Sequence, residues 1–116
     1  MARKPRLVSP TSIYHVMSRG VGKMTIFSNN SDRKKYIKSL AETNEKCCFE
    51  MYAYCLMKNH THLLIKENET EISTIMQCLN TKYAEYFNIK YNRVGHVFQG
   101  RFLSEPIRDD RYFLSV

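Results

Sequence analysis

Residues 52–65 read Tyr52-Ala53-Tyr54-Cys55-Leu56-Met57-Lys58-Asn59-His60-Thr61-His62-Leu63-Leu64-Ile65. Aromatic and branched residues on both sides of the polar pair Lys58-Asn59 predict two β-strands joined by a short turn. Because side chains alternate between the faces of a strand, His60 and His62 are expected on the same face, roughly 6–7 Å apart along the backbone. Two imidazoles on one face can share a divalent metal ion. The stretch therefore indicates either the core of an enzyme or an ordinary hairpin of a small basic domain.

The sequence before this hairpin predicts a strand, a glycine-containing loop and a helix. Residues 13–18 alternate in polarity and contain many β-forming side chains, which favours a strand. Residues 19–23 contain two glycines between Arg19 and Lys23. This loop is equally compatible with a backbone that binds phosphate and with an ordinary turn. Ser31-Asp32 supplies a capping side chain and a carboxylate for the start of a helix that continues to about Asn44.

After the hairpin, apolar residues recur at helical spacing and predict a second helix over residues 71–88. Residues 97–107 follow as a strand that is interrupted at Gly100 and closes near Pro106. Asp109-Asp110 suits the start of a third helix, and no stop signal precedes Val116, so we expect the natural chain to continue. The order β-α-β-β-α-β predicts an α+β, ferredoxin-like fold, in which an antiparallel sheet carries helices on one face, plus the start of a C-terminal helix.

Length and charge limit the class of protein. A chain of 116 residues with 43% apolar residues fits a single domain, over residues 11–116, after a basic arm at residues 1–10. No apolar run is long enough to cross a membrane, and the N-terminus lacks the pattern of a signal peptide. The 18 Lys and Arg exceed the 11 Asp and Glu and give a net charge of +7. Such a charge on a small domain indicates an anionic partner, with nucleic acid as the first candidate.

The cysteines favour a reducing compartment. Cys47, Cys48, Cys55 and Cys78 have no paired C-x-x-C spacing and lie in or beside apolar segments. This pattern predicts reduced core thiols of a cytoplasmic protein rather than a disulfide framework.

The histidine pair on its own is a weak sign of a metal site, because short motifs often match by accident. No Asp or Glu adjoins His60 or His62, and zinc would require three or four protein ligands. Mg²⁺ or Mn²⁺ shared with a phosphate oxygen fits so sparse a ligand set better. A third ligand is expected from elsewhere in the fold or from the substrate.

Three blocks of sequence give a more specific indication. Asn59-His60-Thr61-His62-Leu63-Leu64 resembles the His-hydrophobe-His motif of the HUH single-strand DNA transposases that use one catalytic tyrosine. Similarity to the REP-associated tyrosine transposase branch extends, in the same order, over Tyr14-His15-Val16-Met17-Ser18-Arg19-Gly20, residues 53–62 and Gly95-His96-Val97-Phe98-Gln99-Gly100-Arg101-Phe102. The resemblance spans roughly residues 11–116. It departs from the motif at Thr61, where a bulky apolar residue is expected, but Thr is tolerated in strands.

The resemblance implies a metal-dependent DNA strand transferase. His60 and His62 would hold Mg²⁺ or Mn²⁺ against the scissile phosphate of single-stranded DNA. A tyrosine hydroxyl would then attack and leave a 5′-phosphotyrosine and a free 3′-OH. The resemblance also implies a homodimer that binds DNA hairpins without a nucleotide cofactor, in a bacterial cytoplasm. The residues expected to contact phosphates or bases are Arg19, Lys23, Lys82, Arg93, His96, Gln99 and Arg101.

The attacking tyrosine is expected beyond this chain. In proteins of this kind it lies on the helix after the last strand, in a stretch resembling Val-x-Tyr-Ile-x-x-Asn-Pro. Residues 108–116 match the lead-in to that stretch, which places the nucleophile about three residues after Val116 and makes the chain a fragment truncated within its C-terminal helix. Tyr112 is the fallback, although it lies about two helical turns too early.

Two alternatives stay open. A ferredoxin-like sheet with surface aromatics also forms RNA-recognition modules that cut nothing, and a domesticated transposase would retain only DNA binding. A tyrosine encoded shortly after Val116 would favour the enzyme. The sequence specifies neither the DNA target nor the third metal ligand.

Overall fold

The hairpin at the centre of the sequence forms as predicted. The computed structural model describes residues 8–107. In it, β2 (Glu50–Met57) and β3 (His60–Lys66) pair antiparallel, with Met57 opposite His60. Lys58 and Asn59 are therefore the two residues of the turn.

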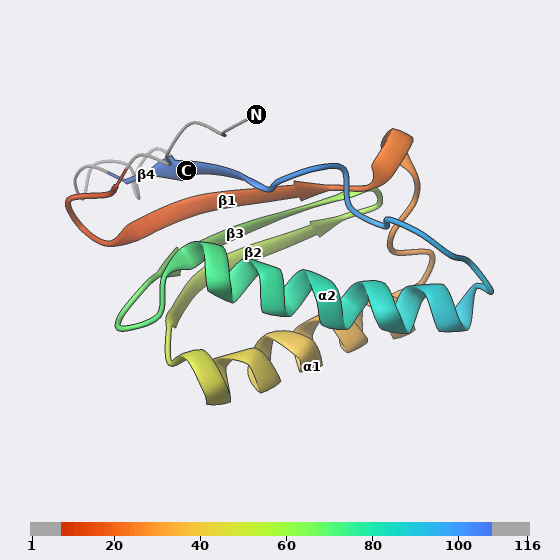
Figure 1. Cartoon of the computed structure of the whole chain (residues 1–116), viewed down its shortest axis with the longest axis horizontal. Coiled ribbons are helices and arrows are strands. Elements are labelled where there is room, and N and C mark those ends of the chain that lie inside the picture. The colour runs from red at the N-terminus through yellow and green to blue at the C-terminus, as the bar shows by residue number, and fades with distance from the viewer. Residues whose placement is uncertain (1–7, 108–116) are drawn as a thin grey trace.

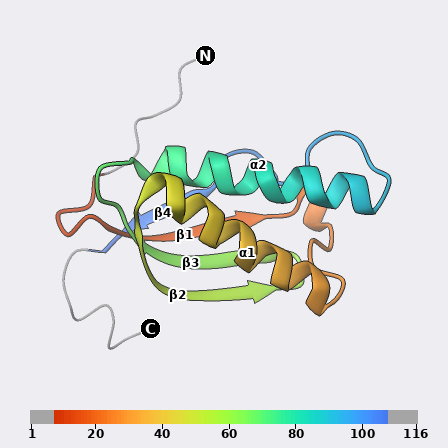
Figure 2. The same cartoon turned by 90° about the horizontal axis from the view of Figure 1, so that it is seen from below.

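The first strand lies in the middle of the sheet. β1 (Ile13–Arg19) pairs antiparallel with β3 on one side and with β4 (Leu103–Pro106) on the other, which gives the order β2-β3-β1-β4. Helices α1 (Asn30–Cys47) and α2 (Ile72–Lys90) pack beside each other on one face of this sheet (Figures 1 and 2). Element order and strand pairing confirm the predicted α+β, ferredoxin-like fold.

The core lies between the sheet and the two helices. Alternation along β1 and β3 directs Val16, Leu63 and Ile65 toward the helices, and all three are buried. The helices contribute the buried residues Tyr36, Leu40, Ile75, Met76, Leu79 and Tyr83. Full burial of one such apolar side chain contributes about 1.5–3 kcal/mol, so this layer fixes which face of each strand turns inward.

The last strand is shorter than the sequence predicted. Residues 97–102 do not belong to it, because Phe98 makes only an isolated bridge to Gly20 and β4 begins at Leu103. Gly100 has a φ of +57°, which glycine adopts without strain, and here the chain leaves the extended path. The strand prediction over residues 97–107 is therefore correct only for its last part.

The helices differ from prediction mainly at their ends. The N-cap of α1 is Asn29 rather than Ser31, and its Oδ1 accepts the Asp32 N–H at 3.0 Å. Asp32 itself is fully buried. The predicted third helix at Asp109, the fallback nucleophile Tyr112 and residues 1–7 of the arm lie outside the described residues.

The cysteines are free thiols, but they are not all in the core. Cys47 is buried, whereas Cys48 and Cys55 are exposed, so the prediction of core positions is wrong for these two. Within residues 8–107, no helix has the length and apolar character needed to cross a membrane.

The second face of the sheet, opposite the helices, is called the open face here (Figure 1). Among the described residues, one end of it carries a small buried apolar cluster of Ile13, Leu64 and Ile107. The other end carries the histidines.

Candidate active site on the open face

Three histidines from two neighbouring strands gather on the open face. On β3, His60 and His62 alternate with Thr61 and Leu63, which are buried on the helix side. The ring centroids of His60 and His62 lie 4.9 Å apart. The two imidazoles therefore share one face, as strand alternation predicted.

His15 is the member that sequence reasoning missed. It lies on β1, and its ring stacks on that of His62 with centroids 5.2 Å apart and planes inclined by 18°. His15 Nε2 and His62 Nδ1 form a hydrogen bond of 3.0 Å. A signal for this position existed, because His15 lies between the inward-facing Tyr14 and Val16 and so belongs to the open face.

A second hydrogen bond holds His60, whose Nδ1 lies 2.7 Å from Asn59 Oδ1. The turn that carries Asn59 is itself anchored by a neighbouring segment. The N–H groups of residues 26 and 27 donate to the Lys58 carbonyl at 2.8 and 3.1 Å, and the Gly20 N–H donates to the Asn59 carbonyl at 2.9 Å. These bonds fix the backbone next to His60.

The surroundings of His62 favour its neutral form. Burial lowers the pKa of His62, and positive charge on His15 or His60 lowers it further. A neutral imidazole is the form that binds a metal ion. Within residues 8–107, no group of three or more His, Cys, Asp and Glu side chains is arranged to hold an ion. His60 and His62 can supply two ligands, which fits an ion that keeps water and substrate phosphate in its shell.

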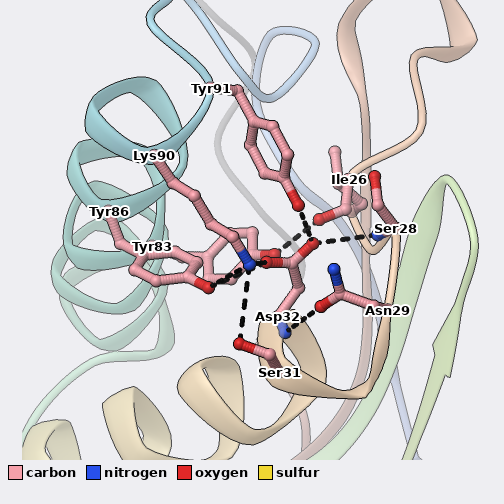
Figure 3. A network of polar contacts seen from close by, with 9 residues as sticks. All are labelled: Ile26, Ser28, Asn29, Ser31, Asp32, Tyr83, Tyr86, Lys90 and Tyr91. Carbon is pink, nitrogen blue, oxygen red and sulfur yellow. Dashed lines mark hydrogen bonds and ion pairs between the residues drawn. The ribbon is translucent and has the colours of Figure 1, made fainter.

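A buried carboxylate supports the segment that anchors the turn (Figure 3). Asp32 Oδ1 accepts from Lys90 Nζ at 2.7 Å and from the Tyr86 hydroxyl at 2.8 Å. Its Oδ2 accepts from the Tyr91 hydroxyl at 2.6 Å and from the Ser28 N–H at 2.9 Å. Burial raises the pKa of Asp32, but these hydrogen bonds outweigh that effect and hold the pKa at about 2. Asp32 is therefore ionised and fully satisfied.

This network joins the end of α2 to the residues that precede α1. The Tyr83 hydroxyl donates to the Ile26 carbonyl at 2.5 Å, and Asp32 holds the Ser28 N–H. Because residues 26 and 27 in turn bind the Lys58 carbonyl, the network fixes the support on which the hairpin turn rests. The sequence indicated a helix-start carboxylate at Asp32, but no local pattern indicated that α2 side chains converge on it.

Three predicted DNA-contact residues lie near the His60 end of the sheet. Arg19 is exposed at the end of β1 and stands opposite His60 in the β1–β3 register. Lys23 is exposed at the end of the short helix η1 (Val21–Lys23). The Gln99 N–H donates to the Arg19 carbonyl at 2.7 Å. The fold thus brings Gln99 to the same end of the site as Arg19 and Lys23, which are about eighty residues earlier in the sequence.

Two more predicted contacts line a cleft. His96 and Arg101 are exposed on its rim, and the cleft, of about 840 Å³, lies between α2 and residues 95–102. Half-buried Phe98 and Phe102 form part of its wall. The cleft therefore combines cationic and apolar surface.

The last two predicted DNA-contact residues, Lys82 and Arg93, lie neither beside His60 nor in this cleft. Lys82 lies apart from the others, in a groove of about 470 Å³ between α1 and α2. Arg93 is partly buried and donates to Asn88 Oδ1 at 2.8 Å and to the His96 carbonyl at 3.3 Å. These bonds give Arg93 a structural role in holding residues 93–96 against the end of α2.

Comparisons with known proteins identify the family and the fold of the chain. The family described as "Transposase IS200 like" matches residues 9–114. The fold is similar to that of a REP-associated tyrosine transposase bound to a REP hairpin, with a TM-score of 0.77, 13% identity, and coverage of 99% of this chain and 67% of that chain. It is also similar to a candidate transposase from Deinococcus radiodurans R1, with a TM-score of 0.69, 12% identity, and coverage of 98% of this chain and 92% of that one. No curated protein sequence matches the chain.

At such low identity the two solved structures establish the fold, and the family match establishes the relationship. It spans nearly all of the sequence, including the three blocks in which the resemblance was found. The chain belongs to the IS200-like transposase family.

Proposed function

We propose that this chain is the catalytic domain of a transposase that cuts and rejoins single-stranded DNA through a tyrosine–phosphate intermediate. One observation carries the proposal: His60 and His62 lie together on the open face, with ring centroids 4.9 Å apart. Family membership supports DNA cleavage as the activity. The similar transposase bound to a REP hairpin supports hairpin DNA as the partner.

In this proposal, His60 and His62 would hold a divalent ion, Mg²⁺ or Mn²⁺, through their Nε2 atoms. When bound, the ion polarises the scissile phosphate and favours in-line attack. Binding requires neutral imidazoles, and burial, which lowers the pKa of His62, favours that form. Two side-chain ligands would leave the remaining positions of such an ion to the phosphate and to water.

The nucleophile in this proposal is the tyrosine expected about three residues after Val116, with Tyr112 as the alternative within the chain. Its hydroxyl gives up a proton to solvent and forms the new ester bond to phosphorus, and the bond to the 3′ oxygen of the preceding nucleotide breaks, with that oxygen taking up a proton from solvent. The products are a 5′-phosphotyrosine and a free 3′-OH. Because the ester retains the bond energy, the reverse step joins the strand to a new 3′-OH.

The DNA in this proposal crosses the basic end of the domain. Arg19, Lys23 and Gln99 contact the strand beside His60, and His96 and Arg101 contact it at the cleft. Cations neutralise phosphates, and the aromatic rings of the cleft wall offer stacking surface to unpaired bases. We further propose that the protein acts as a homodimer in a bacterial cytoplasm.

The test is a cleavage assay with the full-length protein, a single-stranded hairpin oligonucleotide and Mn²⁺. Wild type should form a covalent adduct, and mass spectrometry of that adduct identifies the nucleophilic tyrosine. His60→Ala and His62→Ala should abolish cleavage while leaving binding, measured by fluorescence anisotropy, within about threefold of wild type.

His96→Ala is the matched histidine control. It should weaken binding and preserve metal-dependent cleavage. Cleavage by His60→Ala at the wild-type rate would refute the metal assignment. Intact hairpin binding with no adduct under any metal condition would instead favour a DNA-binding module.

A further inference from the structure

The two proposed metal ligands share an arrangement that strand alternation does not require. Each has its Nδ1 within hydrogen-bond distance of a neighbouring polar atom: Asn59 Oδ1 at 2.7 Å from His60, and His15 Nε2 at 3.0 Å from His62. A neutral imidazole carries one proton, so the partner of Nδ1 decides whether Nε2 has a free lone pair. The inference below rests on the proposed role of His60 and His62 in metal binding.

At His60, the hydrogen bond to Asn59 Oδ1 allows only one position for the ring proton. An amide oxygen accepts hydrogen bonds and cannot donate them. His60 must therefore carry its proton on Nδ1 to make the bond to Asn59 Oδ1, and Nε2 is left with its lone pair. The Gly20 N–H donates to the Asn59 backbone carbonyl, which fixes the backbone that carries this acceptor.

At His62 two arrangements are chemically available. If His62 donates from Nδ1 to His15 Nε2, then His62 Nε2 keeps a lone pair and can ligate a metal. If His15 donates instead, the His62 proton is on Nε2, and neither His62 nitrogen can ligate without breaking the bond. The near-parallel stacking of the two rings, 18° between planes, holds them at this contact.

We propose that His15 and Asn59 are positioning residues that hold His62 and His60 in the Nδ1–H tautomer, so that both Nε2 atoms are available to one divalent ion. His15 lies on β1, which the sheet fixes through its pairing with β3. Asn59 lies in the hairpin turn, whose backbone carbonyls accept hydrogen bonds from the N–H groups of residues 20, 26 and 27. Hydrogen-bonded partners of this kind orient metal-binding histidines, and their loss typically weakens metal affinity by about 10–100-fold.

The primary test needs no variant and no metal. Two-bond ¹H–¹⁵N correlation spectra of histidine-labelled, metal-free protein report the tautomer of each ring directly. At pH 8, above the ordinary histidine pKa of about 6.5, His60 and His62 should both show the Nδ1–H pattern. An Nε2–H pattern at His62 would overturn the assignment of His15, and the same pattern at His60 would overturn that of Asn59.

Paired variants test the cause. His15→Leu removes the acceptor and should shift His62 toward the Nε2–H tautomer and weaken Mn²⁺ binding by about 10-fold or more. His15→Gln offers an amide oxygen in the same place and should restore both properties to near wild type. Met17→Leu, opposite His62 on the same face of β1, is the packing control and should change neither. For His60, Asn59→Leu removes the acceptor and corresponds to His15→Leu, whereas Asn59→Asp keeps an acceptor oxygen and corresponds to His15→Gln.

Unchanged tautomers and Mn²⁺ affinity in the folded Leu variants would overturn the proposal. If a Leu variant fails to fold, the wild-type spectra and the Gln and Asp variants still decide the question. The outcome is separate from that of the proposed function. Fixed tautomers that respond to His15 and Asn59 would support the positioning role even if the full-length protein did not cleave DNA.

Discussion

Replacing Asp32 with Asn should destabilise the fold at pH 7 by about 2 kcal/mol. The tyrosine hydroxyls around Asp32 can rotate and accept, but Lys90 Nζ on the Oδ1 side and the Ser28 N–H on the Oδ2 side can only donate. Whichever way the Asn amide turns, its NH₂ group meets one of these donors. A buried donor left without a partner costs about 1–3 kcal/mol. The Lys90 side chain is 32% exposed and can turn to water, which keeps the cost near the middle of this range.

The same carboxylate predicts a pH dependence. Burial raises the pKa of Asp32, and hydrogen bonds from Lys90, Tyr91, Ser28 and Tyr86 lower it, from the ordinary 3.8 to about 2. Because the folded-state pKa is the lower one, the stabilisation is present above about pH 4 and is lost as the pH falls toward about 2. The gap corresponds to about 2.5 kcal/mol, and solvent screening at Lys90 reduces this to about 1–2 kcal/mol.

Urea unfolding followed by circular dichroism, repeated at steps between pH 7 and pH 2, measures both effects. Wild type should lose stability across the acid range, and Asp32→Asn should lose about 1–2 kcal/mol less over the same interval. Glu45→Gln removes an exposed carboxylate from the same helix and should behave as wild type. A loss below about 0.5 kcal/mol for Asp32→Asn at pH 7, the range of ordinary surface changes, would refute the reasoning. The reasoning would also be refuted if the free energy of unfolding of Asp32→Asn fell with acid pH as steeply as that of wild type.

Three further changes are expected to have measurable effects. Gly20→Ala should destabilise more than Gly22→Ala in thermal unfolding, because a Cβ on Gly20 would lie 2.3 Å from the Met24 carbonyl oxygen. Gly22 has open space around it, and only its φ of +58° opposes the change, at a cost of about 1–2 kcal/mol. Equal losses for the two variants would contradict the steric argument. Tyr83→Phe should cost about 1–2 kcal/mol by removing the donor to the Ile26 carbonyl. Tyr36→Phe should cost less in the same urea titration, because the buried Tyr36 hydroxyl has only the Thr61 hydroxyl beside it and makes no bond of good geometry to it; the reverse order would contradict the assignment of the two hydroxyls. Arg101→Ala should weaken single-stranded DNA binding and reduce the slope of log affinity against log salt by about 0.7, measured by anisotropy. Lys38→Ala, on the exposed surface of α1, is its control, and a greater effect there would move the DNA path to the helical face.

Local periodicity was sufficient for the elements whose residues are close in sequence. The hairpin, α2 and β1 follow from alternation or helical spacing, and the shared face of His60 and His62 follows from the same rule. The late start of β4 at Leu103 follows only in part. The sequence predicted an interruption at Gly100, but not that the residues before it would make only an isolated bridge between Phe98 and Gly20.

The supporting residues of the site could not be predicted for a similar reason. His15 meets His62 across 47 positions of sequence, and Lys90 meets Asp32 across 58. A single sequence contains no local pattern that pairs such positions. Strand alternation could have placed His15 on the open face, but its hydrogen bond depends on the register between β1 and β3.

The central position of β1 has a consequence for the order in which the domain folds. The β2–β3 hairpin closes through a two-residue turn and can form within microseconds. β1 is synthesised earlier, yet both of its partners follow it in the chain, and its pairing with β3 must close a long loop at an entropic cost. High sequence separation of this kind slows folding. His60 and His62 can therefore come together early on the hairpin, whereas the bond from His15 forms only when the central strand docks, so the complete histidine cluster forms later than the hairpin that carries two of its members.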